Sequence, residues 1–453
     1  MGRPAGHPEN VRHLLHRPPC RCERHERIDK AARFAGPAGP ARADAKIEVV
    51  GPDDEISKVL YRLGGGVISS VASSPAGDAI AFAWTAREFP MWYRLGILRP
   101  DGEPVLTRPE VRVWGRPRWA STGDLAVGGL DGIRRVVVGV NPGSAENHLV
   151  ASAPDASYEL VEYLRADVAT CRRRTLDGSI EIVHHTSDGD AVIETEKASA
   201  LGERSARLVA WEVGGLHLEG MVIPPAVGDP PWELVTFLHG GPVGALLMGE
   251  HERVGAWADT HRATFLPDFP ASGICGEAAM LAAFEASELP EEDHEVDAIL
   301  AGVDALVGMG LADPERLFLI GHSYGAYLVN RAVTRTKRFR AAVCWEGVAD
   351  LRSLDETSLD LQSRWRGGTP DEMPERWSAA SPLDRSERVD TPVLLYYGAL
   401  SNLVGQAGTW SAALRAAGAK AEVVIDPAAG HTFSTVAGAE AFRARVGRWF
   451  LNH

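Results

Sequence analysis

The sequence is short of cysteine, of positive charge and of long apolar runs. Its 453 residues include only five cysteines, an odd number scattered along the chain, which does not suit a disulfide framework and favours a reducing, cytoplasmic compartment. No stretch approaches 18 uninterrupted apolar residues, so we expect no membrane-spanning helix and no membrane partner. The formal net charge of −14 argues against nucleic acid as a partner, because nucleic-acid binders concentrate positive charge.

The first 45 residues differ from the rest in charge. They hold nine Arg and Lys against five Asp and Glu, with several Pro and Gly, so we predict a disordered basic leader over residues 1–45. They lack the apolar core of a signal peptide, which again favours the cytoplasm. Cys20 and Cys22 lie there near two histidines, but this spacing is not that of a zinc finger, and we predict no metal site.

Residues 46–204 contain short apolar runs separated by turn residues. Similar strand and turn units recur at Gly77 and Gly123, 46 positions apart, close to the roughly 40–45 residues of a propeller blade. We predict a shortened, β-propeller-like all-β domain with room for three or four blades. A plain antiparallel sheet or sandwich would produce the same turn signals. An incomplete propeller would expose strand edges that a second copy of the chain could cover, which leaves a homo-oligomer open.

The pattern changes near residue 205, where strands begin to alternate with helices. Such alternation predicts an α/β domain over residues 205–453, with a mostly parallel sheet covered by helices on both faces. In sheets of this kind, ligands bind outside the carboxyl ends of the strands. We expect strands at 208–211, 216–222, 234–238, 264–266, 316–320, 341–345, 393–397 and 421–425, and helices at 295–309, 324–334, 406–417 and 437–451.

A serine stands between the strand at 316–320 and the following helix. It lies in the motif Gly321-His322-Ser323-Tyr324-Gly325, whose glycines permit the sharp strand-to-helix turn of a nucleophile elbow. The motif alone is weak in a chain with 47 glycines, but its place between strand and helix makes Ser323 our candidate nucleophile. A plain turn serine is the alternative.

A serine nucleophile needs a base and a site for the developing oxyanion. His431 lies between the last strand and the last helix, where the order Ser, acid, His places the base. Gly240 and Gly241 follow the strand at 234–238, where a loop of this type donates backbone N–H groups. We predict that the amides of Gly241 and Tyr324 form the oxyanion site. The alternative for His431 is a plain surface histidine, and the alternative for the glycine loop is a plain Gly-Pro turn.

These motifs together resemble the prolyl oligopeptidase family of serine peptidases, nearest its acylaminoacyl-peptidase-like branch. The resemblance covers roughly residues 207–451 and adds the segments at 313–316, 338–343 and 430–433. It implies an α/β-hydrolase domain paired with an N-terminal β-propeller that restricts the active site to short peptides. Members commonly carry seven blades, and this chain has room for about half of them.

Two positions depart from the family pattern. The resemblance implies an acid where this chain has Ser401, and without one a loss of about 10⁴ in kcat is typical. We favour Glu346, directly after the strand at 341–345, as the replacement acid; Asp350, Asp426 or no acid at all are the alternatives. The second departure is at 268–273, where relatives usually carry an arginine that is missing here.

We therefore predict a serine hydrolase that cleaves a peptide or peptide-like amide through an acyl-enzyme on Ser323. One alternative is an esterase, or an acyltransferase of the tailoring type, that acts on a small acyl substrate. Another is a non-catalytic relative that keeps the fold for binding. The sequence contains no phosphate-binding or dinucleotide fingerprint, and we expect no cofactor.

Overall fold

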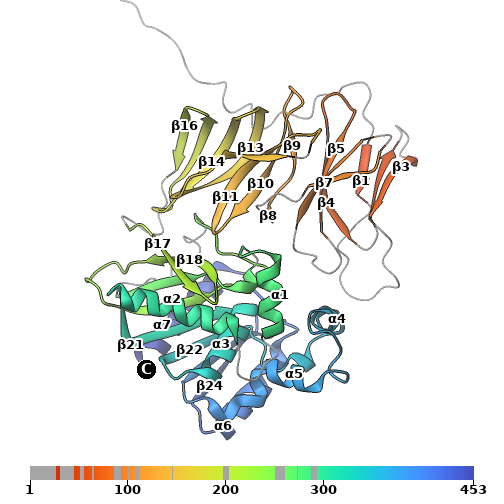
Figure 1. Ribbon diagram of the computed structural model, residues 1–453. Coiled ribbons are helices and arrows are strands. Elements are labelled where there is room, and N and C mark those ends of the chain that lie inside the picture. Colours follow the sequence, from red (N-terminus) through yellow and green to blue (C-terminus); the bar gives the residue numbers. More distant parts are fainter. Residues whose placement is uncertain are drawn as a thin grey trace, which may run out of the picture.

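A computed structural model shows two structural parts, one built from separate β-sheets and one in which strands alternate with helices (Figure 1). In Figure 1 the β-sheets lie above the α/β part. The structure describes residues 27–30, 45–50, 56–63, 66–85, 93–99, 102–107, 112–144, 146–196, 204–249, 261–272, 274–286 and 293–453.

The first part consists of four sheets whose paired strands are all antiparallel in the described residues. In sequence order they contain three, four, five and four strands. The strands are β1 (Arg27–Lys30), β2 (Ala45–Val50), β3 (Ile56–Leu63), β4 (Val67–Ser73), β5 (Ile80–Thr85), β6 (Arg94–Leu98), β7 (Val105–Thr107), β8 (Arg112–Val113), β9 (Arg118–Trp119), β10 (Leu125–Asp131), β11 (Arg134–Val140), β12 (Asn147–Ala151), β13 (Ala156–Arg165), β14 (Val168–Thr175), β15 (Ile180–Thr186) and β16 (Gly189–Glu196).

Successive sheets pack against one another through apolar side chains. Ile47 and Phe82 belong to a cluster between the first and second sheets, Leu95 and Val127 to one between the second and third, and residues of β11 and β13 to one between the third and fourth. Each sheet therefore buries its faces on its neighbours, as blades do. This arrangement confirms the propeller-like prediction over the plain sheet or sandwich.

The prediction of a disordered leader over residues 1–45 is wrong for one segment. Residues 27–30 form β1, which pairs antiparallel with β2. The edge of β2 offers unpaired backbone groups, and a strand from the leader satisfies them. The other residues of the leader before 45, including Cys20 and Cys22, lie outside the described residues.

The second part contains one eight-stranded sheet with the order β17-β18-β20-β19-β21-β22-β23-β24. The strands β17, β18 and β20 pair antiparallel, and the pairs from β20 to β24 are parallel. This is the mostly parallel sheet predicted for residues 205–453. The strands are β17 (Arg207–Val213), β18 (Leu216–Ile223), β19 (Trp232–Leu238), β20 (Arg262–Pro267), β21 (Ala312–His322), β22 (Phe339–Trp345), β23 (Val393–Gly398) and β24 (Ala421–Asp426).

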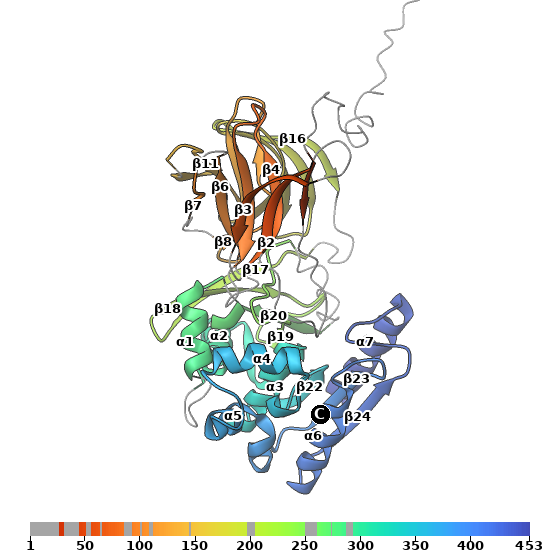
Figure 2. The ribbon, with the colours of Figure 1, turned by 90° about the vertical axis from the view of Figure 1, so that its right-hand side faces the viewer.

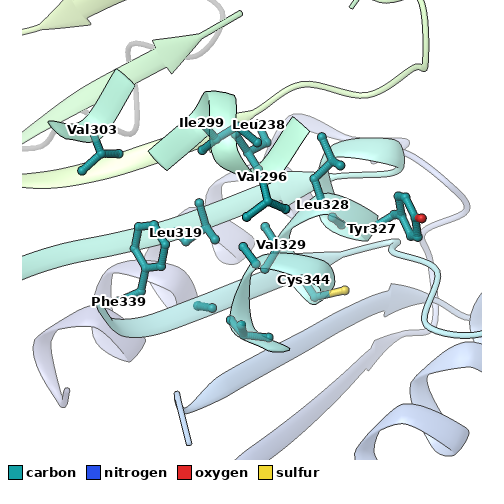
Figure 3. Packing of buried hydrophobic residues seen from close by; sticks show 14 of the residues in the cluster. Leu238, Val296, Ile299, Val303, Leu319, Tyr327, Leu328, Val329, Phe339 and Cys344 are labelled. Carbon is teal, nitrogen blue, oxygen red and sulfur yellow. The ribbon is translucent and has the colours of Figure 1, made fainter. Parts of the chain in front are cut away.

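Helices cover both faces of this sheet (Figure 2). The helices α2, α3 and α6 contribute to one apolar cluster, and α7 packs on the opposite face through Phe442 and Val446. Figure 3 shows Leu328 and Val329 of α3 packed beside Leu319 of β21. The helices are α1 (Glu277–Ala286), α2 (His294–Gly308), α3 (Tyr324–Arg335), α4 (Glu356–Trp365), α5 (Pro374–Ala380), α6 (Val404–Ala416) and α7 (Val436–Leu451).

Polar contacts join the two parts at β18 and at the loop after β19. Arg134 of β11 donates two hydrogen bonds, of 2.6 and 2.9 Å, to the carboxylate of Glu219. The guanidinium of Arg112 in β8 donates to the carbonyl oxygen of Val243 at 3.2 Å. The fourth sheet ends at residue 196 and the eight-stranded sheet begins at 207, but the predicted boundary at 204/205 stays a prediction.

In the described residues, no helix is long and apolar enough to cross a membrane.

Candidate active site

Ser323 occupies a sharp turn between β21 and α3. Its backbone has φ 57° and ψ −117°, a combination that non-glycine residues rarely adopt and that costs on the order of 1–3 kcal/mol. A Cβ at Gly325 would overlap the Leu238 carbonyl, and one at Gly321 would overlap Gly325 itself. The two glycines are therefore required for α3 to approach β19 so closely, and this approach lifts the serine out of the strand.

His431 reaches this serine from the loop between β24 and α7. Its Nε2 atom lies 2.9 Å from the Ser323 hydroxyl oxygen. The neighbouring His322 ring donates from Nε2 to the His431 carbonyl at 2.9 Å and so anchors the loop. Burial lowers the pKa of His322 to about 4, which keeps this ring neutral near pH 7. The structure thus places His431 where a general base for Ser323 has to be.

Glu346 lies behind His431 at the end of β22. Its side chain is fully buried, and one carboxylate oxygen is 3.4 Å from His431 Nδ1. Within the described residues, His431 Nδ1 makes no hydrogen bond, so its interaction with the Glu346 carboxylate at this distance is electrostatic. Catalytic contacts are often this long before substrate binds. The carboxylate also accepts hydrogen bonds from the Gly398 amide at 2.5 Å and from the Ser401 hydroxyl.

The other predicted acids have different partners. Asp350 pairs with Arg352 at 2.7 Å, and Asp426 accepts a hydrogen bond from Tyr396 at 2.9 Å. A carboxylate oxygen of Glu346 lies 3.4 Å from His431 Nδ1, whereas the structure gives no such contact for Asp350 or Asp426. Of the acids considered from the sequence, the structure therefore brings Glu346 to His431. Its catalytic role remains a prediction that the geometry supports.

The glycine loop after β19 lies beside the nucleophile. A Cβ at Gly240 would be 3.4 Å from the Ser323 Cβ, so backbone and nucleophile are in contact there. Tyr324 is the first residue of α3, and its amide therefore has no acceptor within the helix. Gly241 follows in the same loop. The structure thus places Tyr324 next to the serine and the loop of Gly241 beside it through Gly240, while the oxyanion role of Gly241 and Tyr324 stays a prediction.

Two residues that support this loop were missed from the sequence. The buried His239 ring donates to the Gly240 carbonyl at 2.8 Å and stacks on Phe269 with centroids 4.4 Å apart. Burial lowers the pKa of His239 to about 4, so this ring is neutral. Its place before the two glycines could have signalled the role. Arg112, which contacts Val243 of the loop, lies 131 positions away and gives no local signal.

Next to the turn that carries Ser323, buried polar side chains at the start of α2 and in α3 contact one another. The Tyr324 hydroxyl donates to Glu295 at 2.6 Å, and burial raises the pKa of Glu295 to about 8. This carboxyl is therefore mostly protonated at pH 7. Arg331 and Asp293 form a buried ion pair of 2.5 Å nearby. No local pattern connects these residues, because Asp293 and Glu295 are at the start of α2 whereas Tyr324 and Arg331 are in α3.

The segment at 268–273, where the family arginine is missing, holds a buried acid instead. Asp268 accepts hydrogen bonds from the Ser272 hydroxyl and, at 3.3 Å, from the Cys275 thiol. Burial raises the pKa of Asp268 to about 7. Within the described residues, no group of three His, Cys, Asp or Glu side chains could hold a metal ion.

Comparison with known proteins places these observations in a family. Residues 284–453 match the prolyl oligopeptidase family. A "Putative carboxymethylenebutenolidase" of Escherichia coli O157:H7 is 29% identical over 170 residues, which cover 36% of this chain and 55% of that protein. The chain thus spans about half the length of this curated relative.

Solved structures match a larger share of the chain. A Mycobacterium tuberculosis puromycin-hydrolyzing peptidase superposes with a TM-score of 0.65 at 20% identity, covering 89% of this chain and 65% of that one. A Pyrococcus horikoshii acylaminoacyl peptidase gives 0.62 at 15% identity, with 94% and 78% covered. At these identities the likeness establishes the two-part fold. The residues 284–453 that match the prolyl oligopeptidase family include Ser323, Glu346 and His431.

Proposed function

We propose that the protein is a serine hydrolase that cleaves a peptide or peptide-like amide by acyl transfer. The observation that carries the proposal is the 2.9 Å contact between Ser323 Oγ and His431 Nε2, on a strained elbow with a buried carboxylate behind the histidine. A serine and a histidine that only face solvent would not require a strained turn at the serine. The arrangement is that of an activated nucleophile, its base and an orienting acid.

The reaction proceeds in two steps. As Ser323 Oγ bonds to the substrate carbonyl carbon, His431 Nε2 takes the hydroxyl proton, and the amides of Gly241 and Tyr324 donate to the oxyanion. The carbon–nitrogen bond then breaks, and the imidazolium returns the proton to the leaving amine. Water then enters, gives one proton to His431 and bonds to the acyl carbon. The bond between this carbon and Ser323 Oγ breaks, the imidazolium returns the proton to Oγ, and the acid leaves. Glu346 stabilises the imidazolium in both steps.

The substrate class rests on the relatives. Both solved structures named above are peptidases, and one of them hydrolyses puromycin. A second candidate is an ester or lactone as substrate, favoured by the match to a carboxymethylenebutenolidase. Both substrate classes pass through the same acyl-enzyme, so the residues of the site do not separate them.

Turnover with matched substrates tests the proposal. Purified protein is offered aminoacyl p-nitroanilides, an N-acetylated dipeptide amide and short-chain p-nitrophenyl esters, with S323A as the control. We expect hydrolysis of at least one amide by the wild type and its loss in S323A. Ester turnover without any amide turnover would favour the second candidate. Equal rates for wild type and S323A on every substrate would contradict the proposal.

A further inference from the structure

The Glu346 carboxylate is held by the loop after β23 as well as by its own strand. Gly398 donates its amide to one carboxylate oxygen at 2.5 Å, and the Ser401 hydroxyl donates to the other. The oxygen bonded by Ser401 is also the one 3.4 Å from His431 Nδ1. We propose that Ser401 is a positioning residue whose hydroxyl fixes the Glu346 carboxylate against His431. This inference rests on the proposed function.

The direction of the Ser401 hydroxyl is set by a second hydrogen bond. The Leu403 amide donates to Ser401 Oγ at 3.1 Å, just before α6 begins. Because an oxygen that accepts on one side directs its own proton elsewhere, the hydroxyl proton points to Glu346. Ser401 itself is 7% exposed, and its amide donates to the Gly398 carbonyl at 3.1 Å. The donor is therefore shielded from water and fixed in place.

Glu346 needs such support because its backbone is strained. Its φ is 58°, in the left-handed region that residues with a side chain rarely occupy. A buried carboxylate without hydrogen-bond donors is also costly. Together, the donors from Gly398 and Ser401 satisfy the carboxylate and aim it at the histidine. Strain of this kind persists when the surroundings determine the conformation.

The two sequence positions that could carry the acid thus meet in space. The position of Ser401, at which the family pattern has its acid, is in direct contact with the carboxylate that comes from the neighbouring strand β22. The acid and its donor occupy adjoining places behind His431. A carboxylate introduced at 401 should therefore reach the histidine once the Glu346 side chain is removed.

Labelling rates of Ser323 test this inference without knowledge of the substrate. An alkyl fluorophosphonate reacts with wild type, S401A, S401T, E346A, E346A/S401A and E346A/S401D, and p-nitrophenyl acetate gives kcat and KM for each. S411A is the matched control, because Ser411 is a buried serine whose hydroxyl, within the part of the chain that the structure describes, bonds inside α6 to the Gly408 carbonyl. Thermal unfolding of every variant separates loss of function from loss of fold.

We expect S401A to lower kcat and the labelling rate about ten-fold with little change in KM, since one charge-assisted hydrogen bond is lost. S401T keeps the hydroxyl and should stay within about two-fold of the wild type, as should S411A. E346A/S401D should react at least about ten times faster than E346A/S401A, because it restores a carboxylate. A purely packing role of Ser401 predicts no such recovery.

Two results would overturn the inference while the proposed function stands. One is wild-type labelling and kcat in S401A. The other is an E346A/S401D variant no faster than E346A/S401A. Absence of labelling in the wild type would instead remove the proposed function, and the positioning role with it.

Discussion

At the scale of single residues, the acid that lies beside His431 is Glu346. The structure pairs Glu346 with this histidine, although the family pattern expects an acid at position 401. The imidazolium that forms during acyl transfer needs a negative charge at Nδ1. The Glu346 carboxylate is held beside the histidine by two hydrogen-bond donors and can supply that charge.

We expect E346Q to lower kcat by about 10⁴, the typical cost of neutralising a triad acid. The matched control is D426N, because Asp426 is the other acid near the end of a strand and its carboxylate bonds to Tyr396 instead. D426N should keep its activity within a few-fold of the wild type. Stopped-flow or steady-state rates on the best substrate measure both variants. The opposite pattern, a dead D426N beside an active E346Q, would move the acid to Asp426.

The buried Glu295 predicts a pH-dependent difference in stability. Its pKa is raised to about 8 in the folded protein, above its ordinary value in an unfolded chain. Between about pH 4.5 and pH 8 the unfolded state has lost a proton that the folded state keeps, so folding becomes less favourable as pH rises through this window. E295Q has no such proton, and its amide oxygen can still accept from Tyr324.

The free energy of unfolding of E295Q, relative to that of the wild type, should therefore increase from pH 5 to pH 8. Urea denaturation at three pH values measures the difference between the two proteins. A constant difference across this window would show that the folded and unfolded states titrate Glu295 alike, which contradicts the raised pKa.

The α/β elements could be predicted from the sequence because each has its own local signal. The strands at 234–238 and 393–397 are apolar runs bounded by turns, and the structure has them as β19 and β23. The helices α1, α4 and α5 were missed. The apolar positions of α4 are few and none of its residues is fully buried, so its sequence lacks the pattern of a core helix.

The site could be predicted as far as its members follow strands. Ser323 and Glu346 come directly after strands of the parallel part of the sheet and His431 lies in the loop after the last strand, and the carboxyl ends of such strands meet at one edge. The structure brings all three together, and their roles remain predictions. The supporting contacts of Arg112 and Ser401 could not be foreseen, because they depend on distances between segments far apart in the chain.

The close approach of α3 to β19 leads to a prediction about the packing of these two elements. A Cβ at Gly325 would overlap the Leu238 carbonyl, so G325A should destabilise the fold by about 2–4 kcal/mol through backbone strain and overpacking. G408A is the matched control, since a Cβ at this α6 position meets nothing within 4 Å. G408A should be about 0.5–1 kcal/mol more stable than wild type. Thermal unfolding measures both; a wild-type melting temperature for G325A would contradict the close approach.

For the whole molecule, one contact between the two structural parts is at the glycine loop after β19. Arg112 of the β-sheet part is 5% exposed and donates to the carbonyl of Val243, directly after Pro242 of that loop. Burial lowers the pKa of Arg112 to about 10, yet the guanidinium stays charged near pH 7. The β-sheet part thus contributes a hydrogen bond to the loop that contains Gly240 and Gly241.

We expect R112A to lower kcat about ten-fold, because the loop that holds the oxyanion donors loses a charged hydrogen bond. The matched control is R134A, which removes a different arginine contact between the same two parts, that with Glu219. R134A should leave kcat within a few-fold of wild type even if it lowers stability. Steady-state kinetics compares the two; equal losses of kcat in both would indicate a general effect of domain contact rather than one on the loop.

The most direct measurement is mass spectrometry of the protein after reaction with an alkyl fluorophosphonate at pH 7. We predict one phosphonyl group per chain, carried by the peptide that contains Ser323, strongly slowed in H431A and absent in S323A. A chain that stays unmodified, or that carries the group on another residue with Ser323 free, would contradict the claim that His431 activates this serine.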